Sequence, residues 1–318
     1  MPPPPDLSAY RLAAAESEAI FNSEIIPQDI APLPPSPNPK SPLAILAVGQ
    51  TGAGKTRLCP ALLSALAASN RKPAHLIADV YKTHHPSYSS INPSHLASAA
   101  TGPDARIWLS MAVREAARRR LDILLESACR HPSDFTSLAD MLSQEGYRII
   151  VVLLAVPAAL SRLGILARFY GDLPEARSRG LPLRLTPVKV HDDSYEGLVK
   201  GAEWLDGNDV AEQVVVVRRG NLAAYAESRD GASKGGIAEA LRRERRRLLT
   251  EEEKRVALND LKMLNSLPEA VDDTALVRKL LEPLIDEDAG AETFPDLHPL
   301  EFSNSIDAKH DGYNILHI

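Results

Sequence analysis

Short apolar runs recur along the chain at intervals that suit alternating strands and helices. The runs are rich in Val, Ile, Leu and Ala, and segments with helical periodicity, such as Met111 to Arg120, lie between them. Near-continuous runs of this kind are typical of strands buried on both faces of a parallel sheet. The predicted strands are residues 43–48, 74–78, 121–125, 148–155 and 214–217. The pattern therefore predicts an α/β fold with helices on both faces of a parallel sheet.

The segments outside these runs differ in character. Prolines are frequent up to residue 42, and the pattern predicts a helix over 8–22 followed by an extended linker. Beyond residue 233, Thr250 and Glu253 have the spacing of a capping box, and five arginines lie between 242 and 247. These arginines favour a solvated, salt-bridged face, with a phosphate or RNA contact as the alternative. The predicted divisions are 1–42, an N-terminal helix and proline-rich linker; 43–232, the α/β domain; 233–285, a helical extension; and 286–318, an irregular tail.

Composition narrows the partners of the protein. A hydrophobic content of 44% can fill a large core, and a net charge of −6 argues against nucleic acid as a partner. Cys59 and Cys129 form no disulfide framework and indicate a reducing compartment. The first residues lack the basic and apolar regions of a secretory signal, and no apolar run is long enough to span a bilayer. We therefore expect a cytoplasmic protein without a membrane partner.

The first apolar run leads directly into a phosphate-binding loop, and a helical pattern follows it. This strand–loop–helix context is the one that such a loop requires. The glycines let successive backbone N–H groups point at phosphate oxygens, and the helix N-terminus adds its positive dipole end. Lysine reaches the β- and γ-phosphates, and the threonine hydroxyl ligates Mg²⁺. The sequence thus predicts nucleoside triphosphate binding by Gly49, Gln50, Thr51, Gly52, Ala53, Gly54, Lys55 and Thr56.

Acidic residues follow the second and third runs, where parallel strands present ligand sites. Asp79 suits a general base that accepts a proton from an attacking hydroxyl, or a contact to Mg²⁺; its alternative role is a helix N-cap. Glu126 suits a residue that acts through Mg²⁺-bound water or holds substrate hydroxyls. Its alternative role is a strand-end salt bridge with Arg130.

Arginines follow the fourth run. Arg168 lies on a predicted helix, and a passage rich in glycine and arginine extends from Gly171 to Arg184. An arginine-bearing segment opposite a phosphate loop is typical of a lid that brings positive charge to a transferring phosphoryl group. An ordinary basic surface helix is the alternative.

Several blocks, in order, resemble the zeta toxin family of phosphate-loop kinases, whose described members phosphorylate UDP-N-acetylglucosamine. The resemblance covers roughly residues 43–226. Besides the phosphate loop, it rests on Asp79-x-x-Lys82, His85-Pro86-x-Tyr88, Glu126 with Arg130, Gly146-Tyr147, Ala155-Val156-Pro157, the stretch Leu163 to Phe169, Arg184-x-Thr186-Pro187 with His191-Asp192, and Arg219-Gly220 before Tyr225.

The resemblance implies a phosphate-loop kinase fold, a three-layer sandwich with a five-stranded parallel sheet, and the use of ATP and Mg²⁺. It implies that Asp79 deprotonates the 3′-hydroxyl of a nucleotide sugar and that Thr56 holds Mg²⁺. The residues facing the acceptor would be Asp79, Glu126 and Arg130, and those stabilising the γ-phosphoryl would be Lys55, Arg168 and Arg184. The sequence leaves open whether a protein inhibitor or regulator binds this protein.

Departures from the family pattern concern mainly the acceptor side. Ser127-Ala128 stands where members often carry Gly-Thr, and an acidic substrate contact expected on the preceding helix falls near Met111. The leading hypothesis is an ATP-dependent small-molecule kinase acting on a UDP-N-acetylglucosamine-like sugar. The alternatives are a kinase with another hydroxyl acceptor, such as a nucleoside, nucleotide or antibiotic, and a non-catalytic nucleotide-sensing module.

Overall fold

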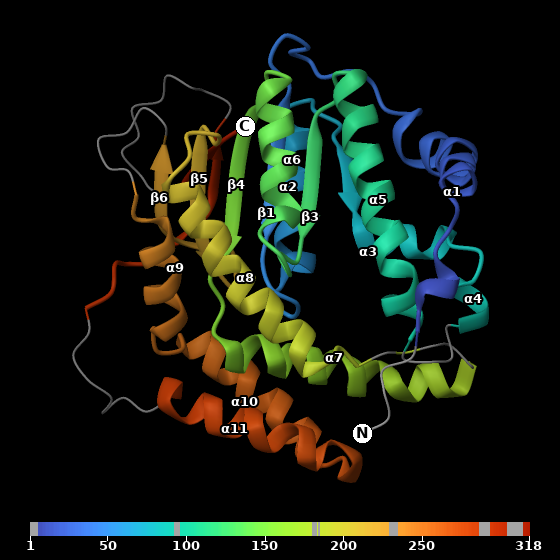
Figure 1. Ribbon diagram of the computed structural model, residues 1–318. Helices are drawn as coiled ribbons and strands as arrows, with labels where there is room; N and C mark the ends of the chain where they lie inside the picture. Colours follow the sequence, from blue (N-terminus) through green and yellow to red (C-terminus); the bar gives the residue numbers. More distant parts are fainter. Residues whose placement is uncertain are drawn as a thin grey trace.

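A mixed seven-stranded sheet forms the centre of the molecule (Figure 1). The computed structural model describes residues 6–91, 96–179, 183, 185–228, 235–285, 293–303 and 314–318. The strand order is β2-β3-β1-β4-β5-β6-β7, and the first five strands are parallel. Strands β6 and β7 extend the sheet in the antiparallel sense. The strands are β1 (Leu43–Val48), β2 (Ala74–Ile77), β3 (Ile123–Ser127), β4 (Arg148–Leu154), β5 (Gln213–Arg218), β6 (Leu222–Ser228) and β7 (His298–Pro299).

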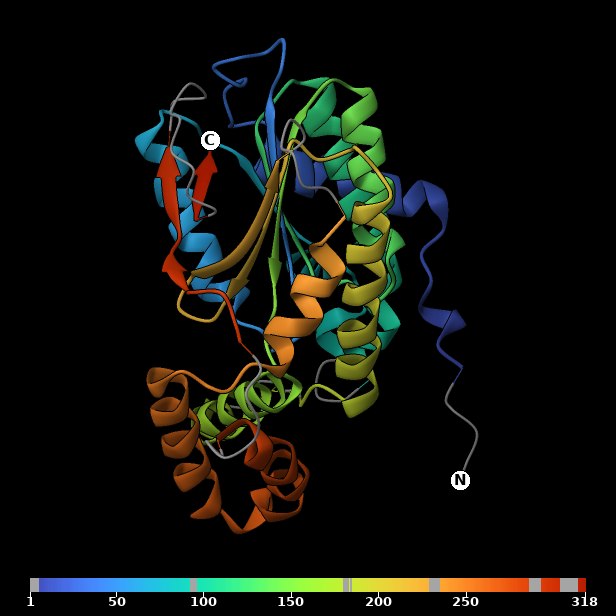
Figure 2. The same cartoon turned by 90° about the vertical axis from the view of Figure 1, so that its left-hand side faces the viewer.

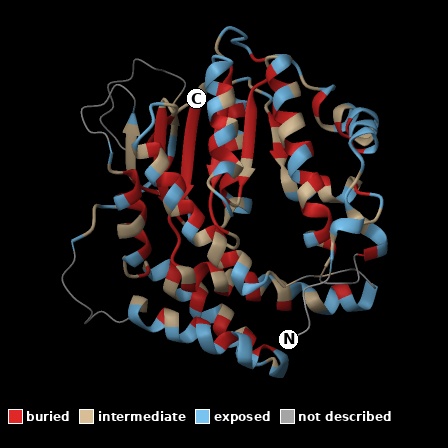
Figure 3. Cartoon of the chain, viewed as in Figure 1, coloured by how far each residue is buried: buried red, intermediate tan, exposed pale blue. Residues whose placement is uncertain are grey.

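Helices cover both faces of the sheet, which gives three layers (Figure 2). Successive strand side chains alternate between the two faces, so β1, β3, β4 and β5 each contribute to two separate apolar cores, whereas β2 contributes to one of them through Ala74 and Leu76. Figure 3 shows these strands as buried and the outer helix faces as exposed. One face packs against α5 (Ala97–Arg118), α6 (Ser133–Gln144), α8 (Val188–Asp206) and α9 (Ile237–Arg246), and the other packs against α2 (Lys55–Ala68). The core beside α2 continues beyond the carboxyl ends of the parallel strands into α7 (Ala158–Arg179), α10 (Glu251–Asn265) and α11 (Val271–Ile285).

The N-terminal segment packs beside α5. It contains a short 3-10 turn (Ser8–Tyr10), α1 (Ala14–Ile20) and a π-helix (Phe21–Ile30). The indole Nε1 of Trp108 on α5 donates a hydrogen bond of 3.0 Å to the Ser17 carbonyl oxygen and so joins the two segments. The helical region therefore begins later and ends later than the predicted 8–22.

The C-terminal segment packs as a helical hairpin against α7. Helices α10 and α11 lie along α7 in Figure 1, and the Tyr170 hydroxyl donates to the Glu269 carbonyl oxygen and to the Asp273 carboxylate, both at 2.8 Å. Thr250 and Glu253 form the predicted capping box at the start of α10. Strands β8 (Glu301–Ser303) and β9 (Ile315–His317) form a separate two-stranded sheet that the sequence pattern does not predict.

The passage from Gly171 to Arg179, expected as part of a lid, is helical and continues α7. The predicted bounds of the third strand are wrong. Strand β3 begins and ends two residues later than 121–125, so Glu126 lies within the strand rather than after it. Short helices α3 (Ala78–Tyr81) and α4 (Tyr88–Ile91) and the 3-10 turns Lys82–His84 and Pro268–Ala270 complete the described elements. None of the helices in the described ranges is both long and apolar enough to cross a membrane.

Candidate nucleotide and phosphoryl-transfer site

The phosphate loop follows β1 at the point where strand order reverses, between β3 and β4. Ligands of open α/β sheets bind at such a point, outside the carboxyl ends of the strands. Gly52 and Gly54 have positive φ angles of 77° and 108°, which side chains with a Cβ rarely adopt. Helix α2 begins directly after Gly54, so its N-terminus faces the loop. The backbone therefore has the form that a phosphate group requires.

Helix α7 and Arg219 hold the loop from outside. A Cβ at Gly52 would lie 2.1 Å from the carbonyl oxygen of Ser161 on α7. Arg219 Nη2 donates to the carbonyl oxygens of Gly52 and Leu160, at 2.7 and 2.8 Å, and so ties the loop to the same helix. The close approach explains why glycine is needed here.

The variant Gly52→Ala is expected to lose about 1–3 kcal/mol of folding free energy through backbone strain, with a weakened affinity for ATP. Chemical denaturation and calorimetric titration measure the two effects. Gly171→Ala is the matched control, because a Cβ at Gly171 in α7 meets no atom within 4 Å. A Gly52→Ala protein with unchanged stability and ATP affinity would show that the close approach to α7 does not constrain the loop.

Lys55 lies at the first position of α2 with its ammonium group inside the loop. Its Nζ donates to the carbonyl oxygens of Gly49 and Gln50, at 2.5 and 3.4 Å. Burial lowers the pKa of Lys55, and the negative charges of Glu126 and Asp79 oppose that shift. The ammonium is thus electrostatically linked to both acidic residues that the sequence predicts for the site.

Those two residues occupy the carboxyl ends of strands adjacent to the loop. Asp79 is the second residue of α3, directly after β2, and its side chain is 81% exposed. Its carboxylate forms an ion pair of 2.5 Å with Lys82 Nζ, which also donates to Ser98 Oγ. Glu126 pairs in register with Ala47 on β1 and with Ile77 on β2. The phosphate loop, Asp79 and Glu126 therefore all lie at the carboxyl ends of the parallel strands.

Glu126 and Arg130 have separate partners. Glu126 Oε1 lies 2.8 Å from His75 Nε2, whereas Arg130 pairs with Asp193 on α8 at 3.2 Å. Burial acts to raise the pKa of Glu126, but the hydrogen bonds from His75 and Cys59 and the charge of Lys55 leave it lowered. The salt bridge between Glu126 and Arg130 that the sequence left open does not form among the described residues.

The acceptor-side departures have structural explanations. Ser127 is buried, and its Oγ accepts a hydrogen bond of 3.0 Å from the Cys129 backbone N–H. This bond supports the turn in which Cys129 has a φ angle of 50°. Met111 packs against the apolar core beside α5 rather than standing free as a ligand contact. Neither side chain replaces the polar contact that the family pattern led us to expect.

Arg168 is exposed on α7, three residues after Ile165. A Cβ at Gly52 would lie 2.9 Å from Ile165 Cγ1, so this turn of α7 lies against the phosphate loop. Residues three apart are neighbours on a helix surface, which places Arg168 next to that contact. Arg184 lies outside the described residues.

Arg245, which the sequence pattern does not single out, is a member of the arginine run that reaches the loop. It is 6% exposed, so the expected solvated face is wrong for this residue. Arg245 Nη2 donates to Gln50 Oε1 at 3.2 Å, and the guanidinium lies 3.6 Å from the centroid of the Tyr195 ring. Gln50 Nε2 in turn donates to the Val156 carbonyl oxygen at 2.6 Å. Helix α9 therefore helps to position the phosphate loop, which sequence spacing alone does not indicate.

The loop fits a magnesium nucleotide. Thr56, in the first turn of α2, is exposed, so its hydroxyl is accessible to an ion beside the loop. Two glycines with positive φ, the helix N-terminus and Lys55 suit the phosphates. Together with the parallel sheet, these features define a nucleotide-binding protein of the phosphate-loop kinase class.

Comparison with known proteins identifies the family. The family model described as Zeta toxin matches residues 31–230, more than half of the chain. The chain therefore belongs to the zeta toxin family, which makes it a kinase-like phosphotransferase and confirms the resemblance seen in the sequence.

The relatives are distant. Toxin PezT of Streptococcus pneumoniae is 24% identical over 204 residues, which cover 64% of this chain and 78% of PezT. Toxin zeta of Enterococcus hirae is 23% identical over 192 residues, covering 59% of this chain and 64% of that toxin. A solved structure from the PezAT toxin–antitoxin system of S. pneumoniae has a TM-score of 0.67 at 21% identity and covers 81% of this chain and 98% of that one. This likeness confirms the α/β fold with its largely parallel sheet.

Proposed function

We propose that the protein is an ATP- and Mg²⁺-dependent kinase that phosphorylates the 3′-hydroxyl of a nucleotide sugar resembling UDP-N-acetylglucosamine. The observation that carries the proposal is the arrangement of three adjacent strand ends. They place Lys55 within electrostatic reach of both Asp79 and Glu126, beside a loop shaped for phosphates. Membership of the zeta toxin family supports the same reaction class.

In the proposed mechanism, the hydroxyl oxygen of the acceptor attacks the γ-phosphorus. Asp79 accepts the proton that this hydroxyl loses. The bond from the γ-phosphorus to the β,γ-bridging oxygen breaks, and ADP leaves. Lys55, Arg168 and Arg184 stabilise the charge on the transferring group, because arginine stays protonated and binds phosphate bidentately. Glu126 and Arg130 face the acceptor. Thr56 would hold Mg²⁺, and the ion would supply positive charge to the nucleotide phosphates.

The test uses purified full-length protein, γ-labelled ATP and a panel of nucleotide sugars, nucleosides, nucleotides and aminoglycosides. We expect label to move to a UDP-sugar and to no free sugar, and mass spectrometry to place the phosphate on the 3′-oxygen. A protein that transfers label to no acceptor at any enzyme concentration contradicts the proposal. The variant Lys55→Met serves as the background control for contaminating kinases.

A different hydroxyl acceptor is the second candidate within the same reaction. The observations that favour it are the use of the Ser127 hydroxyl in the turn at Cys129 and the packing of Met111 into the core. A pocket that lacks a polar partner for one substrate group changes acceptor preference substantially. Transfer to a nucleoside or antibiotic, with none to UDP-N-acetylglucosamine, is the result that selects this candidate.

A protein inhibitor is a further proposed partner. The PezAT structure belongs to a toxin–antitoxin system, and by analogy this kinase would be restrained by a second protein.

The non-catalytic alternative predicts ATP binding without turnover. Single-turnover assays with labelled ATP separate it from a slow kinase.

A further inference from the structure

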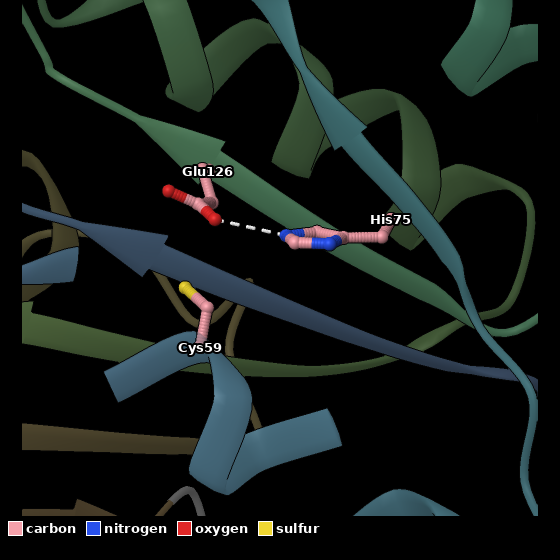
Figure 4. A group of neighbouring side chains, drawn as sticks. All are labelled: Cys59, His75 and Glu126. Carbon is pink, nitrogen blue, oxygen red and sulfur yellow. Dashed lines mark hydrogen bonds and ion pairs between the residues drawn. The ribbon is translucent and has the colours of Figure 1, made fainter. Parts of the chain in front are cut away.

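Three metal-ligating side chains from separate elements meet next to the phosphate loop (Figure 4). Cys59 lies on α2, His75 on β2 and Glu126 on β3. The thiol sulfur, an imidazole nitrogen and a carboxylate oxygen all lie within 4.8 Å of one another. The mechanism proposed above assigns no role to Cys59 or His75.

The fold explains why these three side chains converge. Leu125 on β3 and Leu76 on β2 contribute to the core on the α5 side of the sheet. Because strand side chains alternate, Glu126 and His75 point to the opposite face, which α2 covers. Cys59 follows Lys55 by four residues and so shares its helix face. Cys59 packs into the core between α2 and the sheet, about one helical turn after the loop lysine.

We propose that Cys59, His75 and Glu126 form a binding site for a borderline-soft divalent cation, Zn²⁺, and that occupancy of this site inhibits phosphoryl transfer. The inhibitory part rests on the proposed kinase function, whereas metal binding does not.

The donor set selects the metal. Zinc binds thiolate, imidazole and carboxylate at about 2.0–2.3 Å and accepts three protein ligands with one open position. Magnesium prefers oxygen ligands, and a site with sulfur and nitrogen therefore favours zinc over the nucleotide's own cation. His75 and Glu126 already lie 2.8 Å apart. Small side-chain rotations would bring all three donors to one ion.

Accessibility and charge are compatible with metal entry. The side chain of His75 is 30% exposed and that of Glu126 is 10% exposed, so an ion reaches the buried sulfur from the imidazole side. Because a metal binds the thiolate form of cysteine, the Cys59 thiol proton leaves to solvent when the metal binds. The cation then replaces that proton between sulfur and carboxylate.

Inhibition follows from the shared use of Glu126. The carboxylate is electrostatically coupled to Lys55, and Lys55 is the loop residue that reaches the nucleotide phosphates. A zinc ion on Glu126 would withdraw the carboxylate from the acceptor side. The ion would also place a second positive charge next to the Lys55 ammonium. Repulsion between the two charges would displace the ammonium from the phosphate loop.

The binding test uses tag-free, full-length protein titrated with Co²⁺ and then with Zn²⁺. A thiolate-to-cobalt charge-transfer band at one ion per chain, lost on addition of Zn²⁺, is expected. Cys59→Ser is expected to abolish the band, and His75→Asn to weaken Zn²⁺ affinity by at least ~10–100-fold. Cys129→Ser is the matched control, because Cys129 is the other buried free cysteine and lies outside the cluster; it should keep the band.

Several outcomes overturn the site. These are no thiolate band in the unaltered protein, a band that survives in Cys59→Ser, and a band lost only in Cys129→Ser. Thermal unfolding establishes that each variant is folded; if Cys59→Ser is not, the partly exposed His75→Asn decides the matter.

The inhibition test compares Zn²⁺ titrations of the unaltered kinase and of Cys59→Ser at fixed Mg²⁺ and ATP. We expect Zn²⁺ to inhibit the former at concentrations that leave Cys59→Ser active. Equal inhibition of both proteins overturns inhibition through this site. If neither protein has kinase activity, the proposed function fails, while the cobalt spectra still decide the metal site.

Discussion

Replacement of Asp79 by Asn is expected to lower phosphoryl transfer by ~10²–10⁴-fold, the usual contribution of a general base, and to leave ATP affinity unchanged. Asparagine preserves the size of the side chain but cannot accept the acceptor's proton. Asp79 lies after β2, whereas the predicted nucleotide contacts come from the loop after β1 and from α2. Single-turnover transfer from γ-labelled ATP and calorimetric titration with a non-hydrolysable ATP analogue measure the two effects.

Because the Asp79 side chain is exposed, its replacement tests the chemical role of the carboxylate and not its packing. The side chain is 81% exposed, so its replacement disturbs no core packing, and its ion-pair partner Lys82 is 16% exposed. Asp140→Asn, at an exposed position on α6, is the matched control for loss of one negative charge. Near-normal transfer by Asp79→Asn would rule out the assigned base. A parallel loss of transfer in Asp140→Asn would point to overall charge instead.

Replacement of Arg218 by Met is expected to lower the free energy of unfolding by about 3–5 kcal/mol, because it leaves the buried Glu253 carboxylate without its partner. The Arg218 side chain at the end of β5 is fully buried. Its Nη2 donates to Glu253 Oε2 at 2.6 Å, and its Nη1 donates to the Glu244 carbonyl oxygen at 2.7 Å. Arg218 thus connects the sheet to both α9 and α10.

Chemical denaturation measures the effect, and Arg255→Met is the matched control. Arg255 forms an exposed pair with Glu252 on α10, and its loss should cost no more than about 1 kcal/mol. The double variant Arg218→Met, Glu253→Gln should recover part of the lost stability, because glutamine leaves no buried charge and still serves the capping box. Equal stabilities for Arg218→Met and Arg255→Met would contradict the view that the buried pair joins the helical extension to the sheet.

The buried pair changes how the helical extension over 233–285 is understood. The sequence separates this segment from the α/β domain by composition, yet Arg218 and Arg245 connect it to β5 and to the phosphate loop. A glutamate at position 253 is readable from the sequence as a capping residue. That the same carboxylate also holds a buried arginine depends on packing between elements 35 residues apart.

Local patterns were sufficient for the main elements. Apolar runs identified the five parallel strands, because strands buried on both faces are made mostly of apolar side chains. The phosphate loop and the Thr250 capping box were readable because each depends on residues close together in the chain. Strands β7, β8 and β9 were missed, since runs of two or three residues carry little periodic signal. The seven-residue strand β6, which lies between β5 and β7, was also missed.

The sequence by itself determined the fold class, the phosphate loop and the residue types at the strand ends. Only the tertiary structure decided which of those residues meet. Strand order and register place Glu126 beside His75 rather than Arg130, and helix packing turns Cys59 toward them and Arg245 toward Gln50. The physical reason is that loop and cap geometry depends on local backbone conformation, whereas these pairings depend on the order of strands and on which helix face is buried.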